Sequence, residues 1–195
     1  QANLHDVNAW HLKGRCLTAG GLYDLARTHL KNALVLKPNE PSILASLGRL
    51  EIELGNAEAA LTALNQALQL QPDFPEASLE KGKLLERMGE YEPARKCFEN
   101  IDPTSPFRAD AEYSLAQLHF HAGAFSEAVE QAEKLMARTD NQSTVYRQTA
   151  FVQGRALDKL KKFDQAMAAW KKGNANFQTN FDPSEYASRV NAYIK

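Results

Sequence analysis

The chain has 195 residues, of which 44% are hydrophobic and 24% charged, and its formal net charge is −1 at pH 7. This balance gives no electrostatic reason to expect a nucleic acid or an acidic membrane as partner. No apolar run approaches the roughly 18 residues that a membrane-spanning helix needs. The composition leaves one or two ordinary domains.

The dominant pattern is a spacing of 34 residues between small residues. The first set of glycines is Gly21, Gly55, Gly89 and Gly123, each followed five residues later by an alanine. A second set lies seven residues earlier and consists of Gly14, Gly48, Gly82 and, in the fourth place, Ala116. A period of this length with small residues at the same phases predicts stacked helical repeats.

The period defines four repeats, 7–40, 41–74, 75–108 and 109–142, if Gly14 is numbered position 8 of the first. We expect each repeat to be a pair of helices that cross closely at positions 8 and 20, where only glycine or alanine fits. The glycine at position 15 should end the first helix in the left-handed conformation. Prolines at position 32 should stop the second helix; they are Pro38, Pro72 and Pro106.

The period then slips, because Gly154 lies 38 residues after Ala116. The four extra residues fall in a polar, turn-forming stretch. We therefore predict a loop over Arg138–Gln142 and a helix that starts near Ser143–Tyr146. This helix opens a fifth repeat over 147–178, in which Lys161 stands where the other repeats have the position-15 glycine.

The two ends of the chain depart from the repeat pattern. Residues 1–6 are interpreted as the stub of a preceding helix, and the chain, which begins at Gln1, as a processed or shortened product. Asp182 and Pro183 are favoured at the start of a helix. The apolar residues that follow at helical spacing are Tyr186, Val190, Tyr193 and Ile194. Residues 179–195 are thus predicted to form a capping helix and the start of a link to a further C-terminal region.

Several positions repeat a known consensus, as the first repeat illustrates with Trp10, Gly14, Leu17, Gly21, Ala26, Leu30, Ala33 and Pro38. Residues 7 to about 140 resemble the tetratricopeptide repeat family. The resemblance implies an all-α superhelix, or α-solenoid, of five helix pairs plus a C-terminal capping helix. It also implies a scaffold that binds a protein or peptide in its concave groove, with no enzymatic activity and no cofactor in this chain.

The C-terminal stretch carries a narrower resemblance. Its residues are Phe151, Gly154, Ala156, Leu157, Asp158, Phe163, Asp164, Ala166, Gly173, Asn174, Ala175, Phe181, Asp182 and Pro183. They resemble the last repeat of bacterial proteins that fuse a tetratricopeptide array to a sulfotransferase domain. This implies that the chain is the N-terminal region of a sulfotransferase-like protein, whose catalytic domain would follow. The alternative is a free-standing adaptor for secretion, pilus or envelope assembly.

Positions 2, 5, 9, 12 and 13 of each first helix line the concave groove in this family. Position 9 holds Arg15, Arg49, Lys83, Gln117 and Arg155, and the aromatic groove residues are Tyr113, Phe120 and Phe151. Cations at this spacing suit carboxylates or backbone carbonyls of an extended peptide. In the alternative interpretation the cations are neutralised within the wall, since Arg49–Glu53 and Lys83–Glu86 are spaced to pair along a helix.

Other chemistry is disfavoured. His119 and His121 should face different directions, so no metal site is expected, and no cofactor loop is present. The carboxylate clamp of chaperone-binding relatives needs Lys and Asn where this chain has His11 and Arg15.

The remaining expectations concern packing and compartment. Trp10 and Trp170 are predicted to be core residues. Cys16 and Cys97 lie in different repeats, beyond the roughly 7 Å reach of a disulfide, and are interpreted as free, mostly buried thiols. The expected compartment is the cytoplasm, with the periplasm as the alternative.

Overall fold

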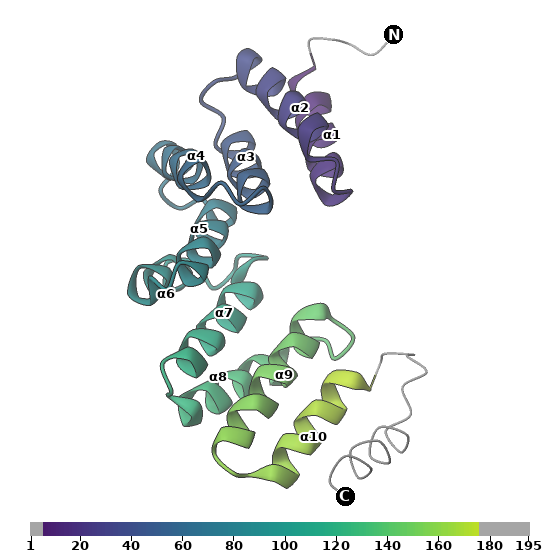
Figure 1. Cartoon of the computed structure of the whole chain (residues 1–195), viewed down its shortest axis with the longest axis vertical. Helices are drawn as coiled ribbons and strands as arrows, with labels where there is room; N and C mark the ends of the chain where they lie inside the picture. Colours follow the sequence, from purple (N-terminus) through teal and green to yellow (C-terminus); the bar gives the residue numbers. More distant parts are fainter. Residues whose placement is uncertain (1–5, 176–195) are drawn as a thin grey trace, which may run out of the picture.

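The computed structural model describes residues 6–175, which fold into ten α-helices with no strand among them. The helices follow one another as pairs joined by short turns (Figure 1). Their bounds are α1 Val7–Ala19, α2 Tyr23–Leu36, α3 Pro41–Glu53, α4 Ala57–Leu70, α5 Pro75–Arg87, α6 Tyr91–Glu99, α7 Arg108–His121, α8 Phe125–Arg138, α9 Thr144–Lys159 and α10 Phe163–Asn174. The predicted all-α solenoid is confirmed.

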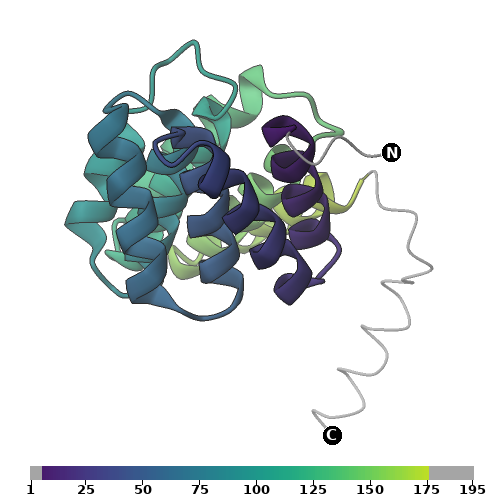
Figure 2. The same ribbon diagram turned by 90° about the horizontal axis from the view of Figure 1, so that it is seen from above.

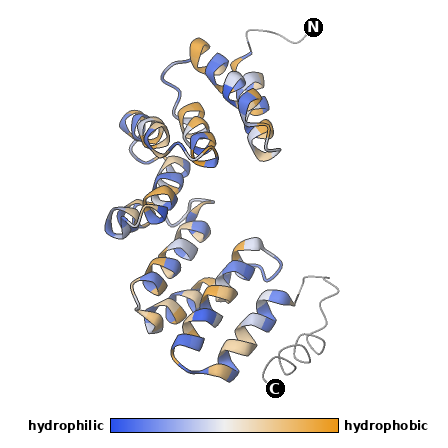
Figure 3. Ribbon diagram, in the orientation of Figure 1, coloured by the Kyte–Doolittle hydropathy of each residue, from blue (hydrophilic) through white to orange (hydrophobic). Residues whose placement is uncertain are grey.

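The first helices of the pairs form a continuous inner row. Helices α1, α3, α5, α7 and α9 contact one another in series, whereas within the described residues the second helices contact only first helices. Seen from above, the pairs wind around a common axis (Figure 2). Each helix carries both hydrophobic and hydrophilic residues (Figure 3), as expected for helices that bury one face.

The turn inside each of the first four pairs depends on a left-handed glycine. The φ angles of Gly21, Gly55, Gly89 and Gly123 are 74°, 77°, 81° and 76°. The N–H of Leu22 donates to the carbonyl of Leu17 at 2.9 Å, which closes the end of α1. Lys161 makes the same turn in the fifth pair with φ 61°, although a residue with a side chain is strained there.

The close crossing of the two helices in a pair explains the glycine at position 8. A Cβ atom added to Gly14 would lie 2.6 Å from Leu30, and one added to Gly82 only 2.4 Å from Phe98. Gly154 meets Trp170 in the same way. Trp10 and Trp170 both pack against buried clusters, which confirms their predicted core role.

In the fourth pair the two helices cross with a small residue on each side instead of a glycine facing a large residue. Ala116 replaces the glycine at position 8, and Ala132 replaces the large residue at position 24 of the facing helix. Both alanines are fully buried. The extra methyl group of Ala116 is therefore matched by a smaller residue at position 24.

The slip in the period occurs where it was predicted, except that Arg138, expected in the loop, is the last residue of α8. Helix α8 ends at Arg138 and α9 begins at Thr144. The hydroxyl of Ser143 accepts the N–H of Tyr146 at 3.1 Å and caps the new helix.

The predicted proline stop is wrong for the third pair. Helices α2 and α4 each end two residues before their proline, but α6 ends at Glu99, well before Pro106. Asp102 precedes Pro103, and a residue before proline avoids the helical conformation. The Asp102 carboxylate also accepts the N–H of Thr104 at 2.7 Å, which fixes a turn.

Two buried carboxylates hold helices together, and neither was predicted. Glu51 of α3 accepts two hydrogen bonds from Arg27 of α2. Glu112 of α7 pairs with Arg108 of the same helix and with Arg138 of α8. Because both glutamates are buried, these contacts are internal to the fold.

The ends of the chain and the two thiols differ in part from the predictions. The capping helix over 179–195 and residues 1–5 of the predicted stub lie outside the described residues. Asp6 is not part of a preceding helix but the N-cap of α1, since its carboxylate accepts the N–H of Asn8 at 2.9 Å. Both cysteines are free, but Cys16 is exposed rather than buried. Cys97 is half-buried, and burial raises the pKa of its thiol.

Candidate peptide-binding groove

The predicted groove residues all lie on the inner row of helices. Arg15 is on α1, Arg49 on α3, Lys83 on α5, Gln117 on α7 and Arg155 on α9. The structure divides them into a charged pocket near the N-terminal end and an aromatic cluster near the C-terminal end.

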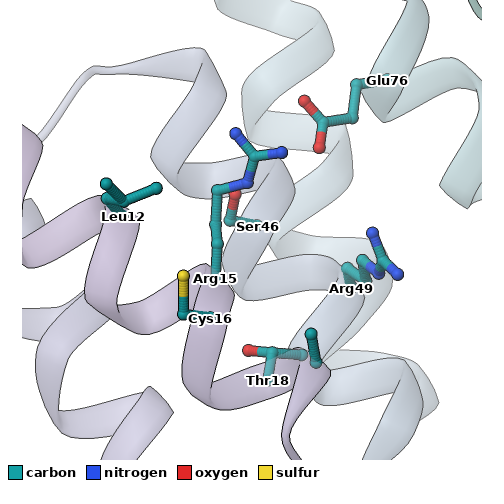
Figure 4. Close-up of a pocket in the computed structure, with 8 residues that line it drawn as sticks. Leu12, Arg15, Cys16, Thr18, Ser46, Arg49 and Glu76 are labelled. Carbon is teal, nitrogen blue, oxygen red and sulfur yellow. The ribbon is translucent and has the colours of Figure 1, made fainter.

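The charged pocket lies between α1, α3 and α5 and has a volume of about 290 Å³. It is lined by Leu12, Arg15, Cys16, Thr18, Ala19, Ser46, Arg49 and Glu76. The end groups of Arg15 and Glu76 face each other, and Arg49 lies on the neighbouring helix and lines the same pocket (Figure 4). The volume is at the lower end of the roughly 300–1,000 Å³ typical of small-molecule sites, so one or two peptide side chains fit it better than a large cofactor.

Neither arginine of the pocket is neutralised by a close partner. Among the described residues, Arg15 and Arg49 form no ion pair or hydrogen bond, and the Arg49–Glu53 pair of the alternative interpretation is absent. Glu76 is half-buried and likewise has no ion pair or hydrogen bond there. Burial raises its pKa above the ordinary value, even though Arg15 and Arg49 act to lower it. The pocket therefore presents two cations and one carboxylate, all available to a ligand.

The aromatic cluster joins α7 to α9. The Arg155 guanidinium lies 4.2 Å from the centroid of the Phe120 ring, a cation–π arrangement. Tyr113 lies on the same helix as Phe120, and its pKa is raised mainly by burial and also by Glu86. This half of the groove offers flat apolar surface with one cation already stacked.

Lys83, between the two groups, pairs with Glu80 at 3.7 Å and not with Glu86 as the spacing had indicated. Glu86 instead lies 3.8 Å from Nε2 of His121. The His121 ring stacks on Tyr91, with centroids 5.9 Å apart and planes inclined by 4°. The row of cations at position 9 is therefore interrupted in its middle.

Phe151 and the two histidines complete the predicted set. A Cβ atom on Gly173 would lie 3.3 Å from the Phe151 ring, so part of this ring packs against α10. His119 and His121 face different neighbours, as predicted: His119 is affected by Arg95 and by acidic residues of α6 and α8. Burial lowers the pKa of His119. Across residues 6–175, no three His, Cys, Asp or Glu side chains converge as a metal site would require.

Sequence reasoning missed the pocket as a unit. Cys16 was assigned to the core, and Ser46 was not considered, although its hydroxyl lies 2.8 Å from Nε2 of His11. Glu76, the carboxylate of the pocket, was not among the predicted groove residues. Its position 2, two repeats beyond Arg15 and one beyond Arg49, was the available signal.

Comparison with known proteins agrees with this architecture. Residues 48–89 match the family described as TPR repeat, and residues 79–144 match the family described as tetratricopeptide repeat. Comparison with curated protein sequences gave no match. Residues 48–144 thus carry tetratricopeptide repeats by sequence, and residues 6–175 have the helical solenoid fold that such repeats form.

Several solved structures share this fold at low sequence identity. A MamA structure aligns with a TM-score of 0.67 and 21% identity over 91% of this chain and 98% of its own. MamA from Desulfovibrio magneticus RS-1 gives 0.69 and 20% over 86% and 92%. PilF from Pseudomonas aeruginosa gives 0.80 and 19% over 89% and 78%. Identities this low establish the fold alone.

None of the helices in residues 6–175 is both long enough and apolar enough to cross a membrane.

Solenoids of this class present extended surfaces on which polypeptides bind. The chain is therefore a protein-interaction scaffold in its architecture.

Proposed function

We propose that this chain binds an extended segment of a polypeptide partner along the inner row of helices. The observation that carries the proposal is the pocket of Arg15, Arg49 and Glu76, which is open to a ligand, whereas the other two cations at position 9, Lys83 and Arg155, contact Glu80 and Phe120. The same row continues to the aromatic surface of Phe120 and Tyr113. A peptide lying along it would meet charged recognition at one end and apolar contact at the other.

Binding of a partner to the inner row is tested by comparing two double variants as affinity baits. Arg49→Ala/Lys83→Ala removes two inner-row cations, whereas Lys96→Ala/Lys171→Ala removes two exposed cations from α6 and α10. We expect a partner retained by the wild type to be lost from the first bait and kept by the second, with unchanged melting temperatures. Retention should weaken as salt rises, because these charges are solvent-accessible. A partner held equally by both baits would contradict binding on the inner row.

We further propose that the chain is the tetratricopeptide region of a bacterial sulfotransferase-like protein, where it would present a polypeptide acceptor. The support is the C-terminal motif from Phe151 to Pro183. Sequencing the gene past the codon for Lys195 tests this directly. A further domain with a sulfonate-donor loop is the expected result, and a stop codon would overturn the proposal.

The free-standing adaptor remains the second candidate. It is favoured by the MamA match, because this chain covers 98% of that chain. A fold of this length can therefore make up almost all of a crystallised protein. The same gene sequence separates the two candidates.

A further inference from the structure

The pocket between α1, α3 and α5 has a charge pattern that selects among peptide ligands. Two guanidinium groups and one carboxylate line the same space of about 290 Å³. No described residue pairs with any of the three at ion-pair distance. Glu76 is half-buried, and an unpaired charge in such a place is costly. Arg15 and Arg49 are exposed and accessible to a ligand carboxylate.

We propose that this pocket is a subsite for a carboxylate flanked by a basic residue on an extended peptide. The carboxylate would lie between Arg15 and Arg49, and the basic group would approach Glu76. This rests on the proposed function and names the chemistry that the groove recognises at its N-terminal end.

The geometry supports this assignment in two ways. Arg15 and Arg49 come from adjacent helices of the inner row and line the same pocket as Glu76, so one short segment can reach all three groups. A guanidinium is also the side chain best shaped to bind a carboxylate through two parallel hydrogen bonds. A purely anionic ligand would satisfy the arginines but leave Glu76 facing a like charge, which disfavours it.

Cys16 provides a probe inside the pocket. Its thiol is free and exposed, and it lines the same space as Arg15. Cys97 is half-buried and lies elsewhere, so it serves as an internal control in the same sample. A peptide that occupies the pocket should slow alkylation of Cys16 by iodoacetamide and leave Cys97 unaffected.

Four short peptides separate the possible sources of the carboxylate. Acetyl-Gly-Glu-Lys-Gly-amide carries both charges, acetyl-Gly-Glu-Gln-Gly-amide only the acidic side chain, and acetyl-Gly-Gln-Gln-Gly-amide neither. Acetyl-Gly-Gln-Lys-Gly with a free C-terminus places the carboxylate at the end of the chain. We expect the Glu-Lys peptide to protect Cys16 at the lowest concentration and the neutral peptide not to protect it. Stronger protection by the free C-terminus would assign the same subsite to a terminal carboxylate instead of a side chain.

Variants of the three charges give the decisive test. Arg49→Gln should raise the half-protecting concentration of the Glu-Lys peptide about tenfold, the effect of losing one charge-assisted hydrogen bond. Arg15→Gln should act in the same way. Glu76→Gln should weaken the Glu-Lys peptide but strengthen the peptide that carries only glutamate. Lys13→Gln is the matched control, because it removes one charge from the same helix as Arg15 without lining the pocket.

Equal protection by the neutral and the Glu-Lys peptides would overturn the subsite, as would an unchanged half-protecting concentration in both arginine variants. An effect of Lys13→Gln equal to that of Arg49→Gln would also overturn it, because general charge would then explain the binding. Each of these failures concerns the pocket alone. The scaffold proposal fails separately, when a partner is held equally by the two double-variant baits.

Discussion

Arg27 of α2 donates two hydrogen bonds to the buried carboxylate of Glu51 in α3, one of 2.9 Å from Nε and one of 2.6 Å from the terminal nitrogen. Asn56 donates a third, of 2.8 Å. Arg27 occupies position 21 of the first repeat and Glu51 position 11 of the second. At the next junction the same two positions hold Leu61 and Leu85, which pack in one hydrophobic cluster. An ion pair and a leucine pair thus serve the same contact between repeats.

Arg27→Ala should destabilise the fold by about 2–4 kcal/mol, because it leaves a buried carboxylate without its cation. Arg95→Ala is the matched control. Arg95 occupies the same position of the third repeat with similar exposure, but its partner Glu92 is solvent-exposed at 3.7 Å. Such a pair contributes roughly 0–1 kcal/mol. Urea denaturation of both variants measures the difference in the free energy of unfolding. Equal losses would show that the buried Arg27–Glu51 pair stabilises the fold no more than the exposed Arg95–Glu92 pair.

The double variant Arg27→Leu/Glu51→Leu should recover most of the stability lost in Arg27→Ala. A buried ion pair replaced by well-packed apolar side chains is often neutral or stabilising, and Leu61 with Leu85 shows that leucines fit this junction. The free energy of unfolding from urea denaturation should return to within about 1 kcal/mol of the wild-type value. A double variant that is no more stable than Arg27→Ala would mean that the backbone of the first junction cannot accept leucines.

Two carboxylates should respond to pH in opposite directions. For Glu51, burial acts to raise the pKa, but the hydrogen bonds from Arg27 and Asn56 outweigh it and hold the pKa below its ordinary value of 4.5. Its contribution to stability is therefore present above pH 4.5 and is lost as pH falls through the lower folded pKa. Glu76 has a raised pKa, so its ionisation costs stability above that pKa, and the cost is relieved as pH falls toward 4.5.

Denaturation at neutral pH and at about pH 4 checks this difference. Glu51→Gln should destabilise at neutral pH and less so in acid. Glu76→Gln should stabilise slightly at neutral pH and have little effect in acid. Parallel pH profiles for the two variants would contradict the opposed environments of these carboxylates.

Gly82 and Phe98, which face each other where α5 crosses α6, should be coupled in their effects on the free energy of unfolding. Gly82→Ala alone should cost about 1–3 kcal/mol, because its methyl group would overlap the ring. In a Phe98→Ala background the same change should cost nothing, since the fourth repeat pairs Ala116 with Ala132 at these positions. A double-mutant cycle should therefore give a coupling of at least about 1 kcal/mol. Additive effects would show that the two residues do not limit the approach of α5 and α6.

Much of the fold was predictable because glycine and alanine at fixed positions indicate where the backbone turns sharply or where two helices cross closely. A left-handed turn and a tight crossing each admit few residue types, so Gly21 and Gly14 reveal them without any knowledge of partners. The end of α6 was not predictable from Pro106 in the same way. Asp102 and Pro103 form a local turn that ends the helix earlier than the repeat period indicates.

The sequence predicted which residues lie on the inner row of helices, but not which charges pair there. Helical phase places Arg49 and Lys83 on the inner row, yet a charge spaced three or four residues away along the helix is only one of several possible partners. Lys83 pairs with Glu80 rather than Glu86, and Glu86 lies beside His121 from the next repeat. Contacts between repeats decide these choices, and they depend on the superhelical geometry. Glu51 had one sequence signal, because it stands where Leu17 and Leu85 stand in other repeats.

Lys161→Gly should stabilise the fifth helix pair. Lys161 holds φ 61°, which costs a residue with a Cβ atom about 1–2 kcal/mol. Glycine removes this strain but loses about 0.5–1 kcal/mol through the greater entropy of the unfolded chain. The expected net gain is about 0.5–1 kcal/mol.

Gly123→Ala is the reverse experiment. An added Cβ would have no neighbour within 4 Å, so the loss of stability comes from the backbone alone. Denaturation midpoints should move in opposite directions for the two variants. A loss of stability in Lys161→Gly would show that contacts of the lysine side chain outweigh the strain.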